Sequence, residues 1–230
     1  MAKKKKRKSK NNRKITVVFF VVILVLLAAF YFFNKEEFKQ ISGFSGKNVK
    51  VSSNIVERVE KNYGAEVEKY AKEFNLPSSY LKALIALECS GRKPPGKRYE
   101  KHIFKRLKNL KDGKIAKYEN IKTQDLSELG DDGLKNLATS WGPFQLMGYK
   151  CFLLKIYVAD IRGSNSLYHG IRWINLTYGN YLRKGNFKDG FHIHNTGRPF
   201  PKNGKPKTYD PSYVERGLKY MEQFESLKTN

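Results

Sequence analysis

The chain has 230 residues and a formal net charge of +24, from 45 Lys and Arg residues against 21 Asp and Glu residues. This length fits one membrane segment and one ordinary domain, and it excludes a protein of several large domains. The excess of positive charge predicts a polyanionic partner. Nucleic acid, a membrane surface and an acidic wall polymer would all satisfy that prediction.

Residues 1–14 and 15–33 together predict a membrane anchor. The first segment holds nine Lys and Arg residues and no acidic residue, and the second is apolar at every position except Thr16. As a helix, 15–33 would be about 28 Å long, close to the hydrocarbon thickness of a bilayer. Positive flanks stay on the cytoplasmic side. We therefore expect 1–14 to be a cytoplasmic tail and 15–33 to be a single pass of the inner (cytoplasmic) membrane, with the rest periplasmic or otherwise extracytoplasmic.

A cleaved signal peptide is the alternative interpretation of 15–33. Signal peptides usually have a shorter apolar core that ends in small residues at the cleavage site. Here the apolar segment ends with the aromatic residues Phe30, Tyr31, Phe32 and Phe33, which are typical of a membrane interface. We therefore expect an uncleaved anchor. An extracytoplasmic domain also argues against nucleic acid as the partner.

Cys89 and Cys151 would then lie in an oxidising compartment, where disulfides form and persist. The sequence does not show that the two residues are close in space. A disulfide and a pair of small, buried hydrophobic side chains both stay open as interpretations.

Residues 34–54 contain Gly and Ser without strong hydrophobic periodicity, so we expect a stalk between the membrane and a domain over 55–230. In the domain, apolar residues recur at helical spacing from Ile55 to Phe74. Pro77 is then expected to open a second helix, which stops near Gly91.

The rest of the domain has fewer clear signals. Residues 92–137 are rich in charge and Gly, and they predict irregular structure apart from a short strand or two. Further helices are expected later in the chain. The expected elements are strands around Arg98–Phe104, a helix from Pro143 to Leu154, helices over Ser166–Leu182 and Phe187–His192, a loop over 197–209, and a last helix after Asp210 and Pro211. This order predicts a mostly helical α+β domain.

Glu88 is the strongest candidate for a catalytic residue. It follows Leu84 by four positions and Ile85 by three, so it continues the apolar face of the second helix. A carboxylate on that face loses solvation, and the negative end of the helix dipole also disfavours its charge. A general acid in a glycosidase needs a carboxyl group that keeps its proton. The structural alternative is an ion pair with Arg92 or Lys93.

Glu100 is the candidate for a second carboxylate. On a strand, alternation would place Arg98, Glu100 and His102 on one face. The alternative is a surface charge between basic neighbours.

The segment 138–147 is expected to be a turn that leads into a helix, capped by Thr139 or Ser140. Trp141 could stack on the face of a sugar ring, and Gln145 could form hydrogen bonds with it. The alternative is a structural helix start with a tryptophan in the core.

His192 and His194 are two positions apart, which on a strand would suggest a pair of metal ligands. No third ligand stands at a recognisable spacing, so we expect neither a metal nor a cofactor. Asn195 is the better candidate for a polar side chain that lines a cleft.

Glu88, the segment 99–104 (YEKHIF) and the segment 140–148 (SWGPFQLMG) occur in this order. The order resembles the N-acetylmuramidase family of phage endolysins and bacterial wall enzymes, within the lysozyme-like and lytic transglycosylase superfamily. That family has a catalytic Glu, then Phe-Glu-x-His-x-Phe, then Ser-Trp-Gly-x-Phe-Gln-x-Met-Gly. The resemblance covers roughly residues 60–225.

The chain departs from the family pattern at three places. Tyr99 stands where the family usually has Phe, and His194 stands where it usually has Tyr. The stretch between Glu88 and Glu100 is also shorter than the usual one.

The resemblance implies a lysozyme-like catalytic domain that acts on peptidoglycan. Glu88 would protonate the glycosidic oxygen between N-acetylmuramic acid and N-acetylglucosamine, and Glu100 would stabilise the developing positive charge or position water. The implied substrate-binding residues are Tyr99, Trp141, Gln145, His194 and Asn195. A lytic transglycosylase, which forms an anhydro sugar at the same bond, and a non-catalytic wall anchor are the alternatives. The sequence names no protein partner.

Overall fold

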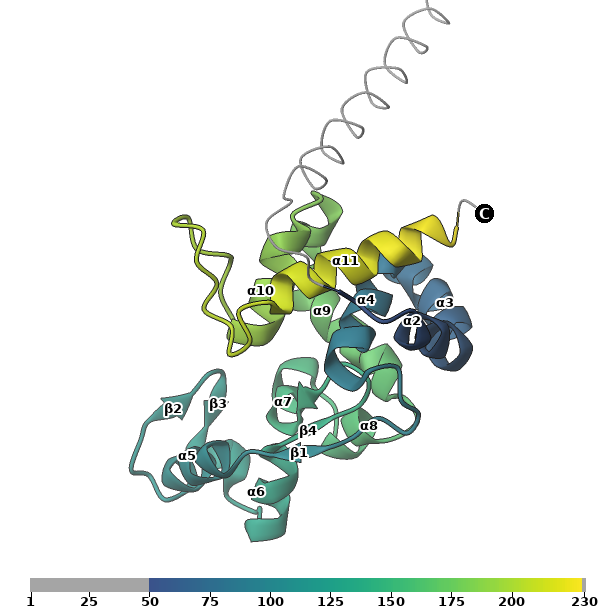
Figure 1. Cartoon of the computed structure of the whole chain (residues 1–230). Coiled ribbons are helices and arrows are strands. Elements are labelled where there is room, and N and C mark those ends of the chain that lie inside the picture. The colour runs from purple at the N-terminus through teal and green to yellow at the C-terminus, as the bar shows by residue number, and fades with distance from the viewer. Residues whose placement is uncertain (1–49, 229–230) are drawn as a thin grey trace, which may run out of the picture. The chain divides into compact units, whose positions relative to one another are not determined.

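The computed structural model describes residues 50–228, which form a mostly helical α+β structure, as predicted (Figure 1). The cytoplasmic tail at 1–14, the anchor at 15–33 and nearly all of the stalk at 34–54 lie outside the described residues, so those predictions stay predictions. No helix among residues 50–228 is long and apolar enough to cross a bilayer.

The first helical segment is continuous from Ser53 to Phe74 and confirms the predicted helix over 55–74. It consists of α2 (Ser53–Val59), the π-helical turn η1 (Glu60–Gly64) and α3 (Ala65–Phe74). The chain leaves this helix at Asn75, whose positive φ of 49° ends it. Its buried side chains recur at helical spacing: Val56, Val59, Tyr63, Val67 and Ala71.

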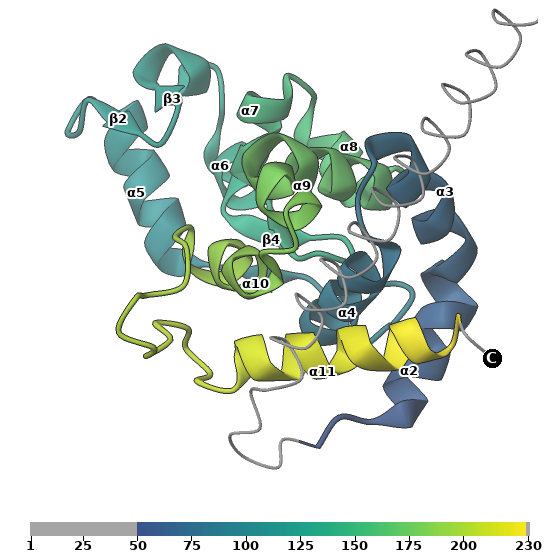
Figure 2. The same ribbon diagram turned by 90° about the horizontal axis from the view of Figure 1, so that it is seen from above.

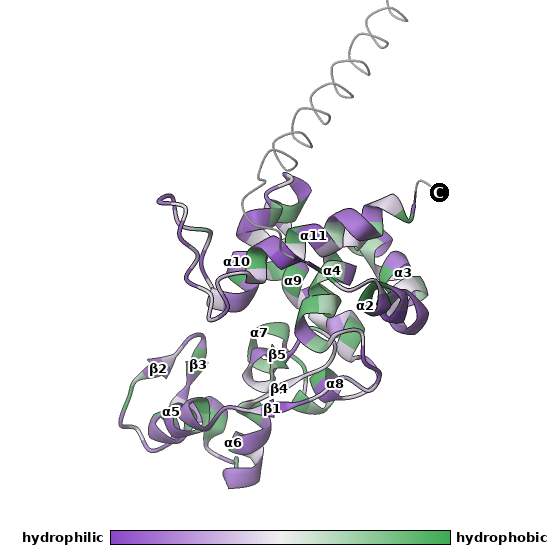
Figure 3. Cartoon of the chain, viewed as in Figure 1, coloured by the Kyte–Doolittle hydropathy of each residue, from purple (hydrophilic) through white to green (hydrophobic). Residues whose placement is uncertain are grey.

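Helix α4 (Ser78–Cys89) is the most buried helix of the described chain, and ten of its 12 residues are buried. It begins directly after Pro77 and ends at Ser90, whose φ is 54°, so the sequence predicted both ends correctly. Helix α11 (Tyr213–Ser226) packs along it, as Figure 2 shows. The apolar residues drawn green in Figure 3 gather on α4 and on α9 (Ser166–Arg183).

A buried cation joins the first helical segment to α4. The side chain of Lys82 is only 5% exposed, and its ammonium lies 2.7 Å from a carboxylate oxygen of Glu60 and 2.7 Å from one of Glu68. Burial opposes the charged form of Lys82, but the hydrogen bonds to the two carboxylates raise its pKa above the ordinary value. Removing either carboxylate would leave buried charge poorly compensated. This cluster is structural, and it lies outside the cleft described below.

The prediction of irregular structure over 92–137 was wrong. This segment contains β1 (Arg98–Tyr99), α5 (Lys101–Lys111), β2 (Lys117–Tyr118), β3 (Ile121–Lys122), the 3₁₀ turn η2 (Thr123–Leu126) and α6 (Asp131–Leu137). The predicted strand around Arg98–Phe104 therefore ends at Tyr99. Ile103, Leu107 and Leu110 recur at helical spacing and are buried. That spacing favours a helix over a strand, but the dense surface charge on α5 and α6 conceals it (Figure 3).

The helix predicted to open at Pro143 is instead a β-hairpin. Strand β4 (Thr139–Trp141) pairs with β5 (Leu146–Met147), and β1 pairs with the other edge of β4 to complete a three-stranded antiparallel sheet. Thr139 and Ser140 are strand residues and cap no helix. Helical structure resumes with η3 (Gly148–Lys150) and α7 (Cys151–Leu154).

The turn of this hairpin explains the difference. Gly142 has φ 72° and Gln145 has φ 48°, and the Gln145 N–H donates to the Gly142 carbonyl at 3.1 Å. Pro143 sits second in this turn, a position that its fixed φ suits as well as it suits a helix start. Glycine tolerates the left-handed conformation at the first position. The sequence signal was therefore ambiguous, and the pairing with β1 decided it.

The C-terminal part follows the prediction closely. After α8 (Val158–Arg162), helix α9 confirms the expected helix over 166–182. Helix α10 (Phe187–Thr196) is longer than the expected Phe187–His192, so His192 and His194 lie on a helix and not on a strand. The loop over 197–209 extends away from the helices before α11 begins (Figure 1). Asp210 accepts hydrogen bonds from the Ser212 N–H and hydroxyl at the start of α11.

Cys89 and Cys151 are both buried and both free thiols, so they form no disulfide in this structure. Burial raises the pKa of each thiol to about 11. The sequence left open a disulfide or a pair of small, buried hydrophobic side chains, and the structure has the second arrangement.

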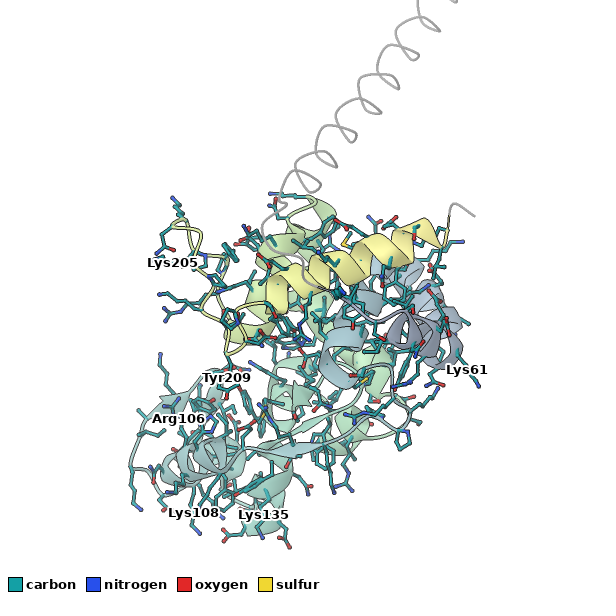
Figure 4. All side chains as sticks on the ribbon, in the orientation of Figure 1. Lys61, Arg106, Lys108, Lys135, Lys205 and Tyr209 are labelled. Atoms are coloured by element: carbon teal, nitrogen blue, oxygen red, sulfur yellow. The ribbon has the colours of Figure 1, made fainter. Side chains whose placement is uncertain are left out.

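The basic side chains cover much of the surface. Lys108 and Lys135 point outward from α5 and α6, and Lys205 lies near the tip of the 197–209 loop (Figure 4). Lys108 pairs with Asp131 at 3.0 Å, but both side chains are about half exposed, so this pair stabilises the fold little. The described surface is therefore rich in exposed positive charge.

Candidate active site

A cleft of about 530 Å³ lies where α4 ends, α5 and α11 begin, and α10 ends beside the β4–β5 hairpin. Five residues singled out by the sequence line it together. They are Glu88, Glu100, Gln145, His194 and Asn195. These residues are far apart in the chain, and only the packing of four helices and one hairpin brings them together.

Glu88 is held at the end of α4, and the turn that follows it is fixed in place. Asn62 donates a hydrogen bond to the Gly91 carbonyl at 2.7 Å, and the Tyr63 hydroxyl donates to the Arg92 carbonyl at 2.6 Å. A side chain at Gly91, where φ is 68°, would strike the backbone of Val59. The helix therefore ends at a defined point, and the Glu88 side chain, 17% exposed, faces the cleft.

Tyr213 contacts Glu88 directly, and no sequence pattern pointed to this residue. Its hydroxyl donates a hydrogen bond to Oε1 of Glu88 from the first residue of α11. Burial raises the pKa of the Tyr213 phenol well above its ordinary value, and the Glu88 charge raises it further. The phenol therefore keeps its hydrogen and acts as a donor. With Oε1 occupied, a proton carried by Glu88 belongs on Oε2.

His194 lies beside the same carboxyl group as a neutral ring. Burial lowers its pKa below the ordinary value, although the charge of Glu88 opposes this shift. Its Nε2 lies 3.0 Å from the Phe144 carbonyl, which can only accept, so Nε2 carries the hydrogen. Nδ1 then accepts from the Tyr178 hydroxyl at 2.8 Å.

This tautomer limits what His194 can do. Its Nε2 is 3.9 Å from Oε1 of Glu88, and the hydrogen on Nε2 is already donated to Phe144. The ring therefore has no free lone pair with which to take a proton from Glu88. His194 therefore lies beside Glu88 as a neutral ring whose two nitrogens are bonded to Phe144 and Tyr178.

Glu100 is held by charged and ionisable groups. Its carboxylate oxygens lie 2.5 Å from the Arg98 guanidinium and 3.5 Å from Nδ1 of His102, and its side chain is 19% exposed. The Glu100 N–H donates to the Ala138 carbonyl at 2.8 Å, which fixes the backbone at the start of α5. The sequence placed Arg98, Glu100 and His102 on one strand face. The three side chains do meet, but His102 reaches Glu100 from a helix.

Gln145 braces the rim of the cleft. Its amide nitrogen donates to the carbonyls of Gly96 at 2.8 Å and Gly142 at 3.0 Å, and its amide oxygen accepts from the Ser140 hydroxyl at 3.0 Å. These contacts tie the segment before β1 to the hairpin. Asn195, in contrast, is exposed at the end of α10 and presents its amide to the cleft.

Tyr99 and Trp141 do not line this cleft. Tyr99 is 46% exposed and packs edge-on against Phe104, with ring centres 6.1 Å apart. Trp141 donates from its indole nitrogen to the Asn136 carbonyl at 3.0 Å and lines a neighbouring hollow. Neither residue lines the cleft that holds Glu88, and the prediction that they bind substrate stays a prediction.

His192 has a structural role. It is 1% exposed, its Nδ1 lies 2.6 Å from the Arg198 carbonyl, and its Nε2 accepts from the Lys207 N–H at 3.0 Å. The ring thus holds together the two ends of the 197–209 loop. Within residues 50–228, no group of three or more His, Cys, Asp or Glu side chains is placed to hold a metal ion.

The cleft contains the carboxyl group of Glu88, which is held through one oxygen, the carboxylate of Glu100, and a polar lining. This arrangement suits proton transfer to an oxygen of a polar substrate, because the Glu88 side chain lines the cleft and its Oε1 is held by Tyr213. Arg92, Lys97 and Arg98 also line the cleft, so its lining carries positive charge beside the two carboxyl groups.

No protein-family model matches the chain, and no curated protein matches it. Among solved structures, the chain is similar to the one described as the crystal structure of Burkholderia AP3 phage endolysin. The two are 18% identical, the match covers 71% of this chain and 70% of that one, and the TM-score is 0.48.

Proposed function

We propose that this protein cleaves the glycan strands of peptidoglycan between N-acetylmuramic acid and N-acetylglucosamine, with Glu88 as the general acid. The observation that carries the proposal is the setting of Glu88 in the cleft. Its Oε1 accepts from Tyr213, its Oε2 is left for the substrate, and Glu100 lines the same polar cleft.

In the proposed reaction, Glu88 transfers the proton on Oε2 to the glycosidic oxygen as the bond to the anomeric carbon breaks. Positive charge develops on the sugar ring, and the Glu100 carboxylate stabilises it or orients a water molecule. Water then adds to the anomeric carbon, and the proton that the water loses restores the protonated form of Glu88. Such acid catalysis contributes about 10²–10⁴-fold in rate.

Lytic transglycosylation is the second candidate, and the contacts of Glu100 favour it. A carboxylate 2.5 Å from a guanidinium and 3.5 Å from an imidazole has much of its charge compensated. A carboxylate held in such contacts is less available to orient a water molecule. In this reaction Glu88 alone acts first as acid and then as base, and a hydroxyl of the same sugar closes an anhydro ring.

The protein is proposed to act from the inner membrane, anchored by residues 15–33 with its cleft outside the cytoplasm. Support comes from the apolar segment and its basic flank in the sequence. A reporter that is active only outside the cytoplasm, fused after Asn230, should be active. Activity of a cytoplasm-only reporter at that position would overturn the placement and, with it, the wall substrate.

Product analysis tests the activity itself. The full chain, purified in detergent, is incubated with peptidoglycan, and the released fragments are weighed by mass spectrometry. Hydrolysis predicts fragments with new reducing ends, and transglycosylation predicts fragments lighter by one water. Binding without any released fragment would contradict both reactions and favour a non-catalytic wall anchor.

A further inference from the structure

A second hollow, of about 340 Å³, adjoins the cleft and is not used by the proposed reaction. Gly96 and Lys97 line both spaces, so they form a shared rim between them. The far wall of the hollow is formed by Trp141 from β4 and Arg162 from the end of α8. A substrate chain in the cleft could therefore extend a branch across this rim.

Two cations flank Trp141 in this hollow. The Lys97 ammonium lies 5.6 Å from the centre of the indole ring, and the Arg162 guanidinium lies 5.9 Å from it. Both distances are within the range of cation–π attraction. Asn136 fixes the arrangement, because its carbonyl accepts from the indole N–H at 3.0 Å and its side-chain oxygen accepts from Arg162 at 3.3 Å.

The basic side chains that line the hollow differ in whether a carboxylate neutralises them. Lys93, which also lines it, pairs with Glu66 at 3.1 Å. Within residues 50–228, neither Lys97 nor Arg162 is paired with a carboxylate. Both side chains are exposed at the surface. The hollow thus offers two available positive charges beside an aromatic ring and the rings of Pro94 and Pro95.

We propose that this hollow binds the stem peptide carried by the glycan strand, through a carboxylate of that peptide. The inference rests on the proposed function, because it places the glycan strand in the adjoining cleft. A short peptide with small apolar side chains and free carboxyl groups matches the chemistry of the hollow. Its apolar part covers Trp141 and the prolines, and its carboxylate meets Lys97 and Arg162.

Direct binding of the isolated peptide is the first test. The full chain in detergent is titrated with a free stem tetrapeptide, and the change in tryptophan fluorescence is followed. We expect saturable binding that Arg162→Gln weakens about 3- to 10-fold, because one charged contact with a carboxylate is lost at a partly exposed site. Trp141→Phe should remove most of the signal.

The matched control is Arg106→Gln, which removes one exposed arginine of α5 that lines neither space (Figure 4). It should bind like the parent protein. The same tetrapeptide with its carboxyl groups amidated should bind the parent weakly, and Arg162→Gln should make no further difference to it. Absence of binding by the parent, or equal binding by the parent and Arg162→Gln, would overturn the proposal.

A second measurement compares cleavage of intact strands with cleavage of strands whose peptides have been removed. Arg162→Gln should slow cleavage of peptide-bearing strands and leave cleavage of peptide-free strands unchanged. An equal loss on both substrates would mean that Arg162 contacts glycan and not peptide. If the parent cleaves neither substrate, the proposed function fails, while the peptide titration still decides whether the hollow binds peptide.

Discussion

Glu88 and Glu100 line the same cleft, yet the groups around them differ in kind. Glu88 contacts a phenol that donates one hydrogen bond and a neutral imidazole 3.9 Å away. Glu100 contacts a guanidinium at 2.5 Å and an imidazole on the surface helix α5 at 3.5 Å. Helices α4, α10 and α11 provide the groups around Glu88, whereas β1 and the start of α5 provide those around Glu100.

This difference assigns different chemistry to the two residues. Neutral partners orient a carboxyl group without neutralising a negative charge on it, so they suit a group that must carry and release a proton. A guanidinium stabilises a carboxylate, so it suits a group that works as a fixed negative charge. The contacts therefore support Glu88 as the acid and Glu100 as the residue that stabilises charge.

The largest effect that separates the two sites is expected from Glu88→Gln. Gln keeps the shape of the side chain and can still accept from Tyr213, but it has no acidic proton. We expect cleavage to fall by about 10²–10⁴-fold. Glu100→Gln should cost less, about tenfold, because it removes a charge that Arg98 already compensates.

Release of fragments from peptidoglycan measures both variants, and circular dichroism checks that each is folded. Full activity in folded Glu88→Gln protein would remove the catalytic assignment. Equal, severe losses in both variants would instead show that Glu100 is the base that activates water, and would favour hydrolysis over transglycosylation.

A smaller effect is expected from Tyr213→Phe, which keeps the ring and removes only the hydroxyl. Oε1 of Glu88 then loses its donor, and the carboxyl group is free to turn. A hydrogen bond to a charged group contributes about 1.5–3 kcal/mol, so we expect a loss of cleavage of about 10- to 150-fold. Tyr220→Phe, another buried tyrosine of α11, is the control and should retain parental activity. If Tyr213→Phe cleaves as fast as the parent, the hydroxyl does not orient Glu88.

The sequence predicted the fold best where apolar periodicity was strong. Helix α4 and its two ends, helix α9 and helix α11 follow from apolar spacing, Pro and Gly. Helix α5 was missed because lysines and arginines fill its exposed positions and its apolar positions are few. The β4–β5 hairpin was missed because Pro143 is compatible with a helix start and with a turn. Only its long-range pairing with β1 distinguishes the two.

The site residues also differ in whether a local sequence pattern or long-range packing determines their role. Glu88 was found because it continues the apolar face of its helix, which is a local pattern. Tyr213 was not found, because its role depends on the packing of α11 against α4, and one tyrosine among 14 carries no local signal. Tyr99 and Trp141 were placed in the cleft by analogy with a motif. The direction of their side chains depends on the pairing of β1 with β4, which no motif specifies.

The protonation of His194 gives a further test of the neutral setting around Glu88. Its pKa is lowered in the folded protein, so at mildly acidic pH the unfolded chain binds more protons at this residue than the folded chain does. Stability from this group is therefore present above the unfolded pKa of about 6.5 and falls as the pH drops below it. The slope from one such group is at most about 1.4 kcal/mol per pH unit.

Urea unfolding of the parent and of His194→Gln between pH 7.5 and about pH 5 measures this contribution. The variant should be less stable at neutral pH, because Gln cannot reproduce both hydrogen bonds of the ring, but its stability should depend less on pH. If the free energy of unfolding depends on pH equally in the two proteins, the His194 ring is not held neutral. The partners of Glu88 would then differ less in kind from those of Glu100.

The smallest effect is expected from reducing agents. Cys89 follows Glu88 directly, so a covalent bond at this residue would be an alternative way to fix the end of α4. The structure has two free, buried thiols instead, and burial raises their pKa values to about 11. The thiolate is the reactive form, so both residues should resist alkylation in the folded protein. Unfolding without a reductant should expose two reactive thiols. A reductant should change neither the melting temperature nor the cleavage rate.

Fewer than two alkylated residues after unfolding, or a drop in melting temperature on reduction, would show a disulfide. The position of Glu88 would then depend on a bond and not only on hydrogen bonds from Asn62, Tyr63 and Tyr213.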